Sequence, residues 1–460
     1  MISIPCSNFF SLQEFFFSSS NTTSKNTTMN SNNKIKMTVI LLLLFSGVKV
    51  CSADSFLTLS QVLKRGISAN PGLKAFKAEK RSAFYRWQSL KSIPGIFFTG
   101  SYSNGNNENF TQNGLPQDLN VGLSESLGPI GSIPLSGKLG LQGYQITRQT
   151  YHLAELSFIQ SLKNSFYSLL ASQEKLKASK ENLNLADRLY HLVKKEYQAG
   201  EVPKTDLINA RIQKASSIQT YIQSQALLQK AQSTLNALLA YPPNHPLAVT
   251  GNLKLPPFHF SINTLFSQAQ THPEIKAAQM AVQKAMTQVS LTRTQYNPSP
   301  SFFYNYDLTL TPEWEVGLNL QFPVFDFGSI KNQVISQEKA VIRNRQVLRQ
   351  TRLTLFSTIQ SALKAYQADY RNALTYSQDV LKPSLKLMKM TEFGYKKGAL
   401  PYLLVLQAQQ TLSRARFHYI SLLLQGHQDL DLLEASAGKT LAKNPDVKKN
   451  HADRKNYVKR

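Results

Sequence analysis

The chain has 460 residues, with 42% apolar and 17% charged side chains and a formal net charge of +25 at pH 7. This composition supports a large buried core and excludes an intrinsically disordered chain. The 52 lysines and arginines are spread along helical stretches, with a denser basic tail at 439–460 that is expected to be solvated. Aromatic-interleaved basic patches of the RNA-binding kind are absent from the sequence, so nucleic acid is not an expected partner. No window reaches the roughly 18 consecutive apolar residues of a membrane-spanning helix, so any passage across a bilayer would use strands.

Residues 1–53 have the pattern of an N-terminal extension followed by a secretory signal peptide. Two lysines precede an apolar run at 38–48, and a small-residue site at 51–53 follows, where cleavage is expected. Both cysteines, Cys6 and Cys51, lie in this part, which predicts a mature chain without disulfides or Cys-ligated metal. The choice of starting methionine and the lipidation of Cys51 stay open, although the two residues before Cys51 do not suit a lipidation signal.

The first half, residues 54–240, combines short strand patterns with very long helical ones. Period-two alternation at 96–104 and 119–127 indicates a weak β-hairpin. Residues 144–199 contain neither Gly nor Pro. At about 1.5 Å per residue such a helix would be roughly 85 Å long, too long for an ordinary globular domain. Its narrow apolar stripe requires neighbouring helices, and the return helix at 203–239 can supply one.

The second half, residues 263–438, follows an irregular connector at 241–262 that contains two Pro-Pro pairs. Residues 301–322 show strong period-two alternation on both sides of a Thr-Pro-Glu turn. Each strand is about ten residues long, the length needed to cross a bilayer at a tilt, although a half-buried hairpin in a soluble domain is the alternative. A long helix at 329–393 is interrupted only by Pro383, and a return helix is expected at 401–435.

The two halves share four landmarks in the same order, which predicts an internal duplication. These pairs are Asn70-Pro71 and His272-Pro273, Ile93-Pro94 and Asn297-Pro298, Ile133-Pro134 and Phe322-Pro323, and the Tyr-x-x-Gly stretches at 197–200 and 395–398. Gly200 and Gly398 suit the left-handed residue that ends a helix. Pro203 and Pro401 then suit the first turn of the next one. The Tyr-x-x-Gly stretches therefore predict two helical hairpin tips at one end of the molecule.

The order of these motifs resembles the TolC family of outer-membrane efflux proteins, over nearly all of residues 55–438. The resemblance rests on the signal peptide, the Asn-Pro-x-Leu opening, the Phe-Pro-Val-Phe-Asp-Phe-Gly run at 322–328 and the duplicated tips. It implies a mixed α+β membrane protein located in the outer membrane. Each repeat would contribute a β-hairpin to a trimeric, 12-stranded transmembrane β-barrel, and long antiparallel coiled-coil helices would form a periplasmic α-barrel, or tunnel. Independently, four strands facing lipid cannot close a barrel and would leave edge backbone groups unsatisfied, so a homotrimer in outer-membrane lipid is a physically consistent expectation.

The same resemblance implies functional residues at the tips. The gate of the tunnel would be formed by Asp206, Asn209, Tyr395, Leu404 and Gln407. The tips that contact a periplasmic adaptor protein would be formed by Tyr197, Gly200, Val202, Gly398 and Leu400. Tyr395 is expected to link neighbouring helices in the closed gate, and capping of the helix near Pro203 is an alternative role for Asp206. Leu404 and Gln407 stand where better-known members carry acidic residues, so no metal site is expected.

The sequence contains no pattern of a catalytic or cofactor site. The eight histidines form no HExxH motif, and no Gly-rich phosphate loop or nucleophile elbow occurs. The Gly-rich run at 137–143 lacks a βαβ context and is expected to join a strand to the long helix. The sequence thus predicts a conduit without enzymatic activity or cofactors.

The leading functional hypothesis is a passive exit duct of a tripartite pump, driven by an adaptor and an inner-membrane transporter, for small toxic compounds or metal ions. One alternative is the outer-membrane component of a type I protein secretion system. A second alternative is a periplasmic structural coiled-coil protein that never enters lipid. The sequence leaves the cargo and the identity of the pump open.

Overall fold

The computed structural model describes residues 56–103, 118–257, 261–308 and 313–438. The chain divides into two compact units, Met1–Ala53 and Asp54–Arg460. The predicted signal peptide with both cysteines, and the basic tail, lie outside the described residues. None of the described helices is both long and apolar enough to cross a membrane.

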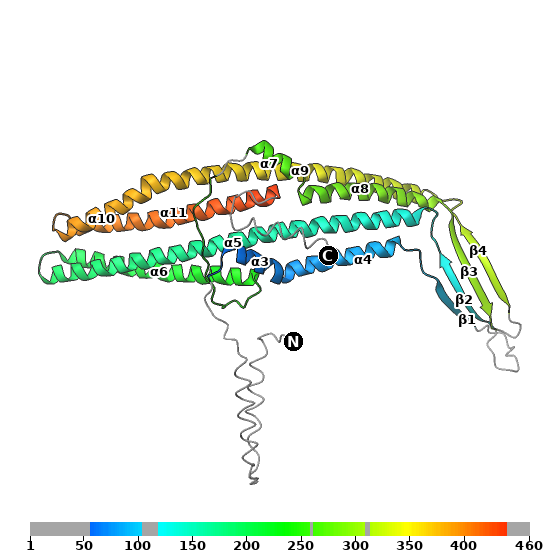
Figure 1. The fold of residues 1–460 in the computed structure, drawn as a ribbon, viewed down its shortest axis with the longest axis horizontal. Coiled ribbons are helices and arrows are strands. Elements are labelled where there is room, and N and C mark those ends of the chain that lie inside the picture. Colours follow the sequence, from blue (N-terminus) through cyan, green and yellow to red (C-terminus); the bar gives the residue numbers. More distant parts are fainter. Residues whose placement is uncertain (1–55, 104–117, 258–260, 309–312, 439–460) are drawn as a thin grey trace, which may run out of the picture. The chain divides into compact units, whose positions relative to one another are not determined.

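The same order of helix, helix, strand, strand, long helix and return helix occurs in both halves of the chain (Figure 1). The first half contains α3 (Leu59–Ala69), α4 (Pro71–Lys91), β1 (Phe97–Ser103), β2 (Asp118–Ser126), α5 (Ser132–Gln198) and α6 (Lys204–Leu238). The second contains α7 (Ile262–Ala269), α8 (Pro273–Arg293), a 3-10 turn (Thr294–Tyr296), β3 (Ser299–Asp307), β4 (Trp314–Gln321), α9 (Ser329–Thr375), a π-helical segment (Tyr376–Leu381), α10 (Lys382–Lys396) and α11 (Tyr402–Ala437). The predicted hairpins and long helices are confirmed, with shifts in their boundaries.

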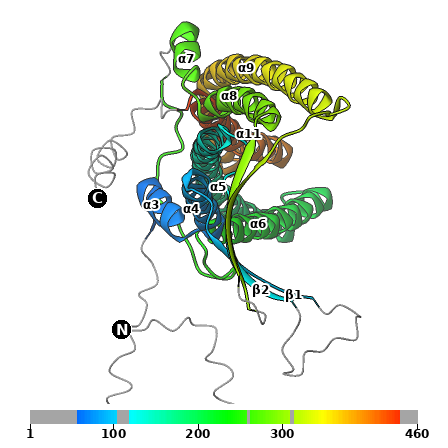
Figure 2. The ribbon, with the colours of Figure 1, turned by 90° about the vertical axis from the view of Figure 1, so that its right-hand side faces the viewer.

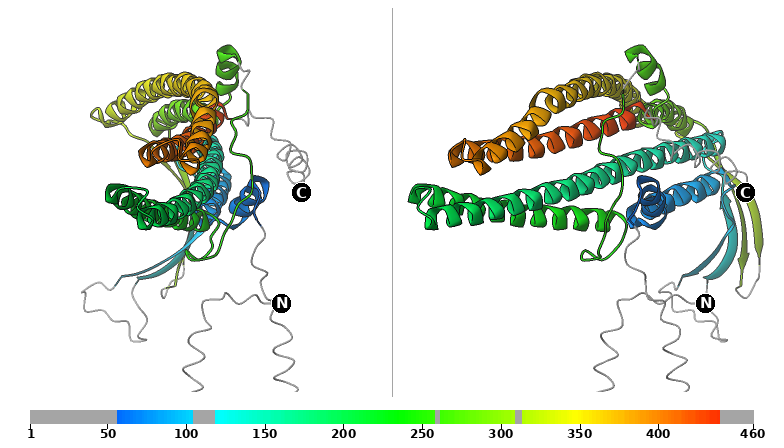
Figure 3. Two further views of the ribbon diagram at one scale, coloured as in Figure 1. Left: turned by 90° about the vertical axis from the view of Figure 1, so that its left-hand side faces the viewer. Right: turned by 60° about the vertical axis from the view of Figure 1, so that its left-hand side comes forward.

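Helix α5 is the longest element, with 67 residues, or roughly 100 Å at about 1.5 Å per residue. It packs against α6 and against α4, which cover different parts of its length (Figure 1), and also against α8 and α11 of the second half. Helix α9 packs in the same way against α8 and α11. Figures 2 and 3 show these helices running alongside one another. Such lateral packing covers narrow apolar stripes that no compact core could cover.

The Gly-rich run at 137–143 is helical, so its predicted role as a strand-to-helix connection is wrong. It lies in the first part of α5, which begins at Ser132 rather than at Tyr144. A Cβ added at Gly140 would stand 3.1–3.2 Å from Leu90 and Trp87 of α4. The glycines therefore allow α4 and α5 to approach closely, a constraint between helices that local sequence patterns do not reveal.

The long helix of the second half is interrupted where Pro383 stands. Pro383 lies in the first turn of α10, and the π-helical segment directly precedes it. A proline ring clashes with the carbonyl of the fourth preceding residue and donates no hydrogen bond, so the wider π turn accommodates it. The long helix predicted at 329–393, with an interruption at Pro383, is thus observed as α9 and α10 joined through the π-helical segment.

The four strands form one antiparallel sheet in the order β1-β2-β3-β4. The register pairs Phe98 with Leu123, Leu123 with Tyr304, and Tyr304 with Val316, so these four side chains share one face. Further apolar residues on this face include Phe302, Leu318 and Leu320, all about half exposed. The opposite face carries polar residues such as Thr99, Asn120, Asn305, Glu315 and Asn319. Among the described residues, β1 and β4 form the two edges of the sheet.

A buried charged cluster joins α5 of the first half to α11 of the second. Lys163 lies 3.3 Å from Asp431 and forms a second ion pair with Glu434. Next to it, the rings of Tyr167 and His427 stack at 3.7 Å. The Nε2 atom of His427 is 3.1 Å from the carbonyl oxygen of Leu253 in the connector. All of these residues except Tyr167 are buried. The cluster ties both halves and the connector together.

Two groups of this cluster have strongly shifted pKa values in opposite directions. Burial raises the pKa of Asp431 to about 7, against the attraction of Lys163, whereas burial lowers the pKa of His427 to about 4. Unfolded Asp and His titrate near 3.9 and 6.5. Between about pH 4 and 6.5 the folded chain therefore keeps a proton on Asp431 that the unfolded chain has lost, so this contribution to stability falls as pH rises. His427 binds a proton only in the unfolded chain over this range, so its contribution rises with pH.

In Asp431→Asn, the rise in stability with pH that His427 causes should no longer be cancelled by the opposite pH dependence of Asp431. We expect the free energy of unfolding of this variant to increase between about pH 4.5 and 6.5, relative to wild type, by up to about 1.4 kcal/mol per pH unit. The matched variant His427→Gln should show a relative decrease over the same range. Guanidinium unfolding of the detergent-solubilised protein, followed by circular dichroism, measures both slopes. Slopes of the same sign in the two variants would contradict this account.

The left-handed turn at Gly398 yields a second stability prediction. Gly398 has a φ of +70°, and a Cβ placed there would meet nothing within 4 Å, so a side chain would suffer only from the backbone conformation. Gly398→Ala should therefore lower the free energy of unfolding by about 1–2 kcal/mol. Gly100→Ala is the control, because that position is equally open and has an ordinary φ. An equal effect of both substitutions on the urea midpoint would be inconsistent with a strained tip.

Candidate functional site

The two hairpin tips have the same backbone structure. After α5, the N–H of Gly200 donates to the carbonyl of Tyr197 (3.1 Å), and Glu201 donates to Glu196 (2.8 Å). After α10, Gly398 donates to Tyr395 and Ala399 donates to Gly394, both at 2.9 Å. This pair of hydrogen bonds around a left-handed glycine is the Schellman motif, which satisfies the last carbonyls of a helix. The conformation predicted for Gly200 and Gly398 is confirmed, with φ values of +80° and +70°.

The prolines of the tips stand one position earlier than the sequence pattern suggests. Pro203 and Pro401 are the N-cap residues of α6 and α11, with extended backbones, and the helices begin at Lys204 and Tyr402. A proline fits there because its fixed φ matches the observed values of −73° and −71°. The tips are therefore short, rigid connections.

An apolar cluster binds the two hairpins to each other just behind their tips. Its buried members come from α5, α6, α10 and α11, and they are Leu189, Val193, Ala210, Met388, Tyr395, Tyr402, Val405, Ala408 and Leu412. The rings of Tyr395 and Tyr402 meet edge to face at 5.8 Å. Because all four helices contribute, neither hairpin can swing away without exposing this cluster to water.

A hydrogen bond between Tyr395, a member of this cluster, and Glu196 links α10 to the end of α5. The Tyr395 hydroxyl donates to the Glu196 carboxylate, which lies in the last turn of α5. Burial raises the pKa of Tyr395, and its hydrogen bond to Glu196 and the charge of Glu196 raise it further. Burial and the charge of Asp206 raise the pKa of Tyr402 to about 12. Tyr395 thus remains a proton donor throughout the physiological pH range.

The structure brings together some of the predicted gate residues and not others. Asp206 lies in the first turn of α6, where the helix dipole favours a carboxylate, and its charge acts on Tyr395 and Tyr402. Asn209 is half-buried on the same helix. Leu404 and Gln407 lie on the exposed face of α11, outside the tip cluster.

The predicted tip residues fall into a packed group and an exposed group. Val202 packs against the tip cluster, and the side chain of Leu400 covers Gly394, where an added Cβ would stand 2.6 Å from it. Tyr197 (37% exposed), Gly200 and Gly398 face solvent. The exposed group is the part of the tips that another protein could reach.

Glu196 is the functional candidate that the sequence interpretation missed. The prediction expected Tyr395 to link neighbouring helices without naming its partner, and in the structure that partner is Glu196. A signal was present, because a carboxylate in the last turn of a helix opposes the helix dipole and needs a compensating contact. Among the described residues, no group of three or more His, Cys, Asp or Glu side chains could hold a metal ion.

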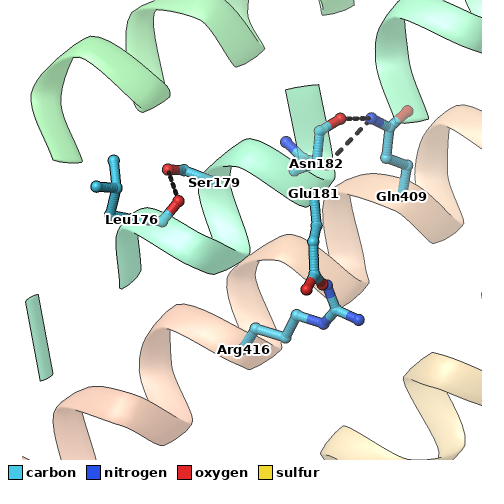
Figure 4. A network of polar contacts seen from close by, with 6 residues as sticks. All are labelled: Leu176, Ser179, Glu181, Asn182, Gln409 and Arg416. Atoms are coloured by element: carbon cyan, nitrogen blue, oxygen red, sulfur yellow. Dashed lines mark hydrogen bonds and ion pairs between the residues drawn. The ribbon is translucent and has the colours of Figure 1, made fainter. Parts of the chain in front are cut away.

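Farther from the tips, polar contacts replace the apolar cluster between the hairpins (Figure 4). The side-chain amide of Gln409 on α11 donates to the side-chain oxygen of Asn182 on α5 at 3.1 Å. Arg416 and Glu181 form an ion pair at 2.9 Å across the same helices. A cavity of about 330 Å³ lies beside these residues and extends to α10. The contact between the hairpins is therefore polar and incompletely packed at this level.

Comparison with known proteins identifies the family. The model of the outer membrane efflux protein family matches residues 62–240 and 266–439. The cobalt-zinc-cadmium resistance protein CzcC of Cupriavidus metallidurans is 24% identical over 60% of this chain and 66% of its own length. The chain thus spans just under two thirds of CzcC. The toluene efflux pump outer membrane protein TtgC of Pseudomonas putida is 22% identical over 78% of both chains.

Solved structures share the fold. The CmeC outer membrane channel of Campylobacter jejuni has a TM-score of 0.71 at 17% identity, covering 94% of this chain and 96% of that one. The open state of the MtrE outer membrane channel of Neisseria gonorrhoeae also has a TM-score of 0.71 at 17% identity, covering 84% and 90%. The family match spans most of the chain and the fold agrees with it: the protein belongs to the outer membrane efflux protein family, and its location is the outer membrane.

Proposed function

We propose that the protein is the outer-membrane exit duct of a tripartite efflux pump. In this proposal it passively conducts small toxic compounds or metal ions from the periplasm to the exterior when a periplasmic adaptor and an inner-membrane transporter engage it. The observation that carries the proposal is the sheet, which has one apolar exposed face, one polar face and two free edges among the described residues. Such a sheet fits a channel wall with lipid outside and water inside.

The free edges support a homotrimer. In hydrocarbon, each unpaired backbone group on β1 or β4 would cost several kcal/mol, so the edges need partners. Three copies joined edge to edge would form a closed 12-stranded barrel, with β4 of one copy antiparallel to β1 of the next. The helices would continue the barrel as a periplasmic α-barrel and tunnel. The two segments matched by the family model also support the proposed domains, 54–240 and 263–438, with the connector at 241–262 between them.

The tips are proposed as the gate and as the docking site for the adaptor. The Tyr395–Glu196 hydrogen bond and the tip cluster hold the two hairpins together, which suits a closed state. The exposed residues Tyr197, Gly200 and Gly398 are the accessible surface for the adaptor. The neutral Leu404 and Gln407 support a gate without a metal site.

The names of the relatives support small toxic cargo. CzcC is named for cobalt, zinc and cadmium resistance, and TtgC for toluene efflux. The type I secretion system remains the alternative, because the duct wall itself favours neither class of cargo. Family membership favours a duct over the third hypothesis, a structural coiled-coil protein that stays in the periplasm.

Deletion of the gene in its host tests this function directly. We expect the deletion strain to become more sensitive to divalent metals or toluene, with an unchanged profile of secreted proteins. Plasmid-borne wild-type protein should restore tolerance, whereas a version lacking residues 97–126, and hence the first hairpin, should not. Unchanged tolerance together with the loss of a secreted protein would instead establish the secretion alternative.

The Tyr395–Glu196 contact generates a prediction for the gate. A hydrogen bond to a charged group contributes about 1.5–3 kcal/mol, so its loss should favour opening by about tenfold or more. Tyr395→Phe and Glu196→Gln should each raise the open probability in planar lipid bilayers, and the double variant should add little. Tyr221→Phe is the matched control, because that hydroxyl accepts a hydrogen bond from Gln225, four residues later on the same helix. Additive effects of the two single substitutions would argue against this contact as the gate latch.

A further inference from the structure

The segment between β4 and α9, residues 322–327, exposes apolar side chains to an unusual degree; we call it the strap. Phe322 is 56% exposed, Val324 72%, Phe325 80% and Phe327 98%. The rings of Phe325 and Phe327 lie 6.4 Å apart. A soluble protein rarely exposes a contiguous patch of large apolar side chains. Such a patch normally marks the binding site of another molecule or of a membrane.

The strap is held in place by a polar anchor. The carboxylate of Asp326 accepts hydrogen bonds from the backbone N–H groups of Gly328 (2.9 Å), Ile330 (3.2 Å) and Lys331 (3.4 Å) at the start of α9. It also accepts one from the hydroxyl of Tyr296 at 3.3 Å. These contacts fix the backbone on both sides of Phe327, so the exposed rings belong to a constrained segment.

Phe327 has a strained backbone, and its side chain makes little contact with the rest of the described chain. Its φ of +47° lies in the left-handed region, which residues with a side chain rarely adopt. Strain of this kind persists where the surroundings enforce it and is concentrated at functional positions. The Asp326 hydrogen bonds hold this backbone conformation, but the ring is 98% exposed, so the chain does not bury it. A partner outside the chain can cover the ring and so compensate for the strain.

The position of the strap points to lipid as this partner. Val316, Leu318 and Leu320 form the apolar face of β4, and Phe322 and Val324 follow directly on this row. At the other edge of the sheet, Ile93 and Ile96 are 69% and 67% exposed just before β1, which begins at the end of the sheet where β4 stops. Aromatic residues at strand ends mark the two boundaries of membrane barrels. A second copy would meet the sheet through its edge backbone, whereas these side chains leave the sheet face.

We propose that the strap is a lipid anchor that lies in the headgroup and acyl-chain boundary of the periplasmic leaflet of the outer membrane. This inference rests on the proposed function, because it requires the apolar sheet face to contact lipid. The strap would set the depth of the barrel by fixing where the sheet ends and the helices begin. Its chemical partner is a phospholipid surface, and no particular headgroup is required.

Single-tryptophan variants test the strap and the sheet separately. The chain has two tryptophans: Trp87 on α4 and Trp314 on the apolar face of β4, 68% exposed. Trp314→Phe leaves a helix probe, Trp87→Phe leaves a sheet probe, and Phe325→Trp in a chain with both replacements gives a strap probe. Each full-length protein is reconstituted into phosphatidylcholine vesicles whose acyl chains carry bromine, a fluorescence quencher, near the headgroup. Val324→Trp provides a second strap probe should Phe325→Trp fail to fold.

We expect the strap probe to lose emission as strongly as the sheet probe, with the helix probe unaffected. A strap probe that resembles the helix probe, while the sheet probe is quenched, would overturn the strap inference and leave the proposed function intact. A strap probe with blue-shifted but unquenched emission would also overturn it, in favour of a second copy covering the rings. An unquenched sheet probe would overturn the proposed function itself.

Discussion

The free edges of the sheet are the constraint on which the other features depend. Strands β1 and β4 each have a row of backbone N–H and C=O groups without a partner strand in the described chain. Water can satisfy such groups, but hydrocarbon cannot. The apolar face of the same sheet is far too exposed for a stable soluble surface. In the proposed homotrimer, edge pairing between copies would satisfy these backbone groups and lipid would cover the apolar face. The same pairing would bring the long helices of neighbouring copies side by side.

Much of this fold could be predicted because its main features are local. Period-two alternation identified all four strands, although it is weaker in the first hairpin, where Glu125 lies on the apolar face and Phe97 on the opposite one. Gly200 and Gly398 identified the tips, because a left-handed helix end favours glycine for reasons internal to the backbone. Both signals need only a few consecutive residues, so one sequence was sufficient.

The features that sequence reasoning missed are contacts between distant segments. Gly140 was assigned to a loop because its neighbour α4 lies fifty or so positions away and cannot be inferred from local pattern. Glu196 was overlooked because its partner, Tyr395, is 199 residues away. Residues 322–327, the strap, contributed to the family resemblance, but their exposure was not predicted. Exposure depends on which distant segments pack over a stretch of chain, and the local sequence does not show this. Gate roles for Asp206, Asn209, Leu404 and Gln407 remain predictions.

The contacts between the two hairpins change in kind along their length. Lys163 is almost fully buried with Asp431 and Glu434, so separating the helices there would leave uncompensated charges in a dry environment. Midway, Asn182 and Gln409 exchange a neutral hydrogen bond beside a cavity, where water can replace the lost partner. At the tips, Tyr395 and Glu196 form a hydrogen bond beside the buried apolar cluster, and Tyr197, the neighbour of Glu196 in the chain, is exposed. In the proposed gate, opening at the tips would therefore have to expose the apolar cluster as well as break the Tyr395–Glu196 hydrogen bond, while the buried ions keep the halves of the chain together.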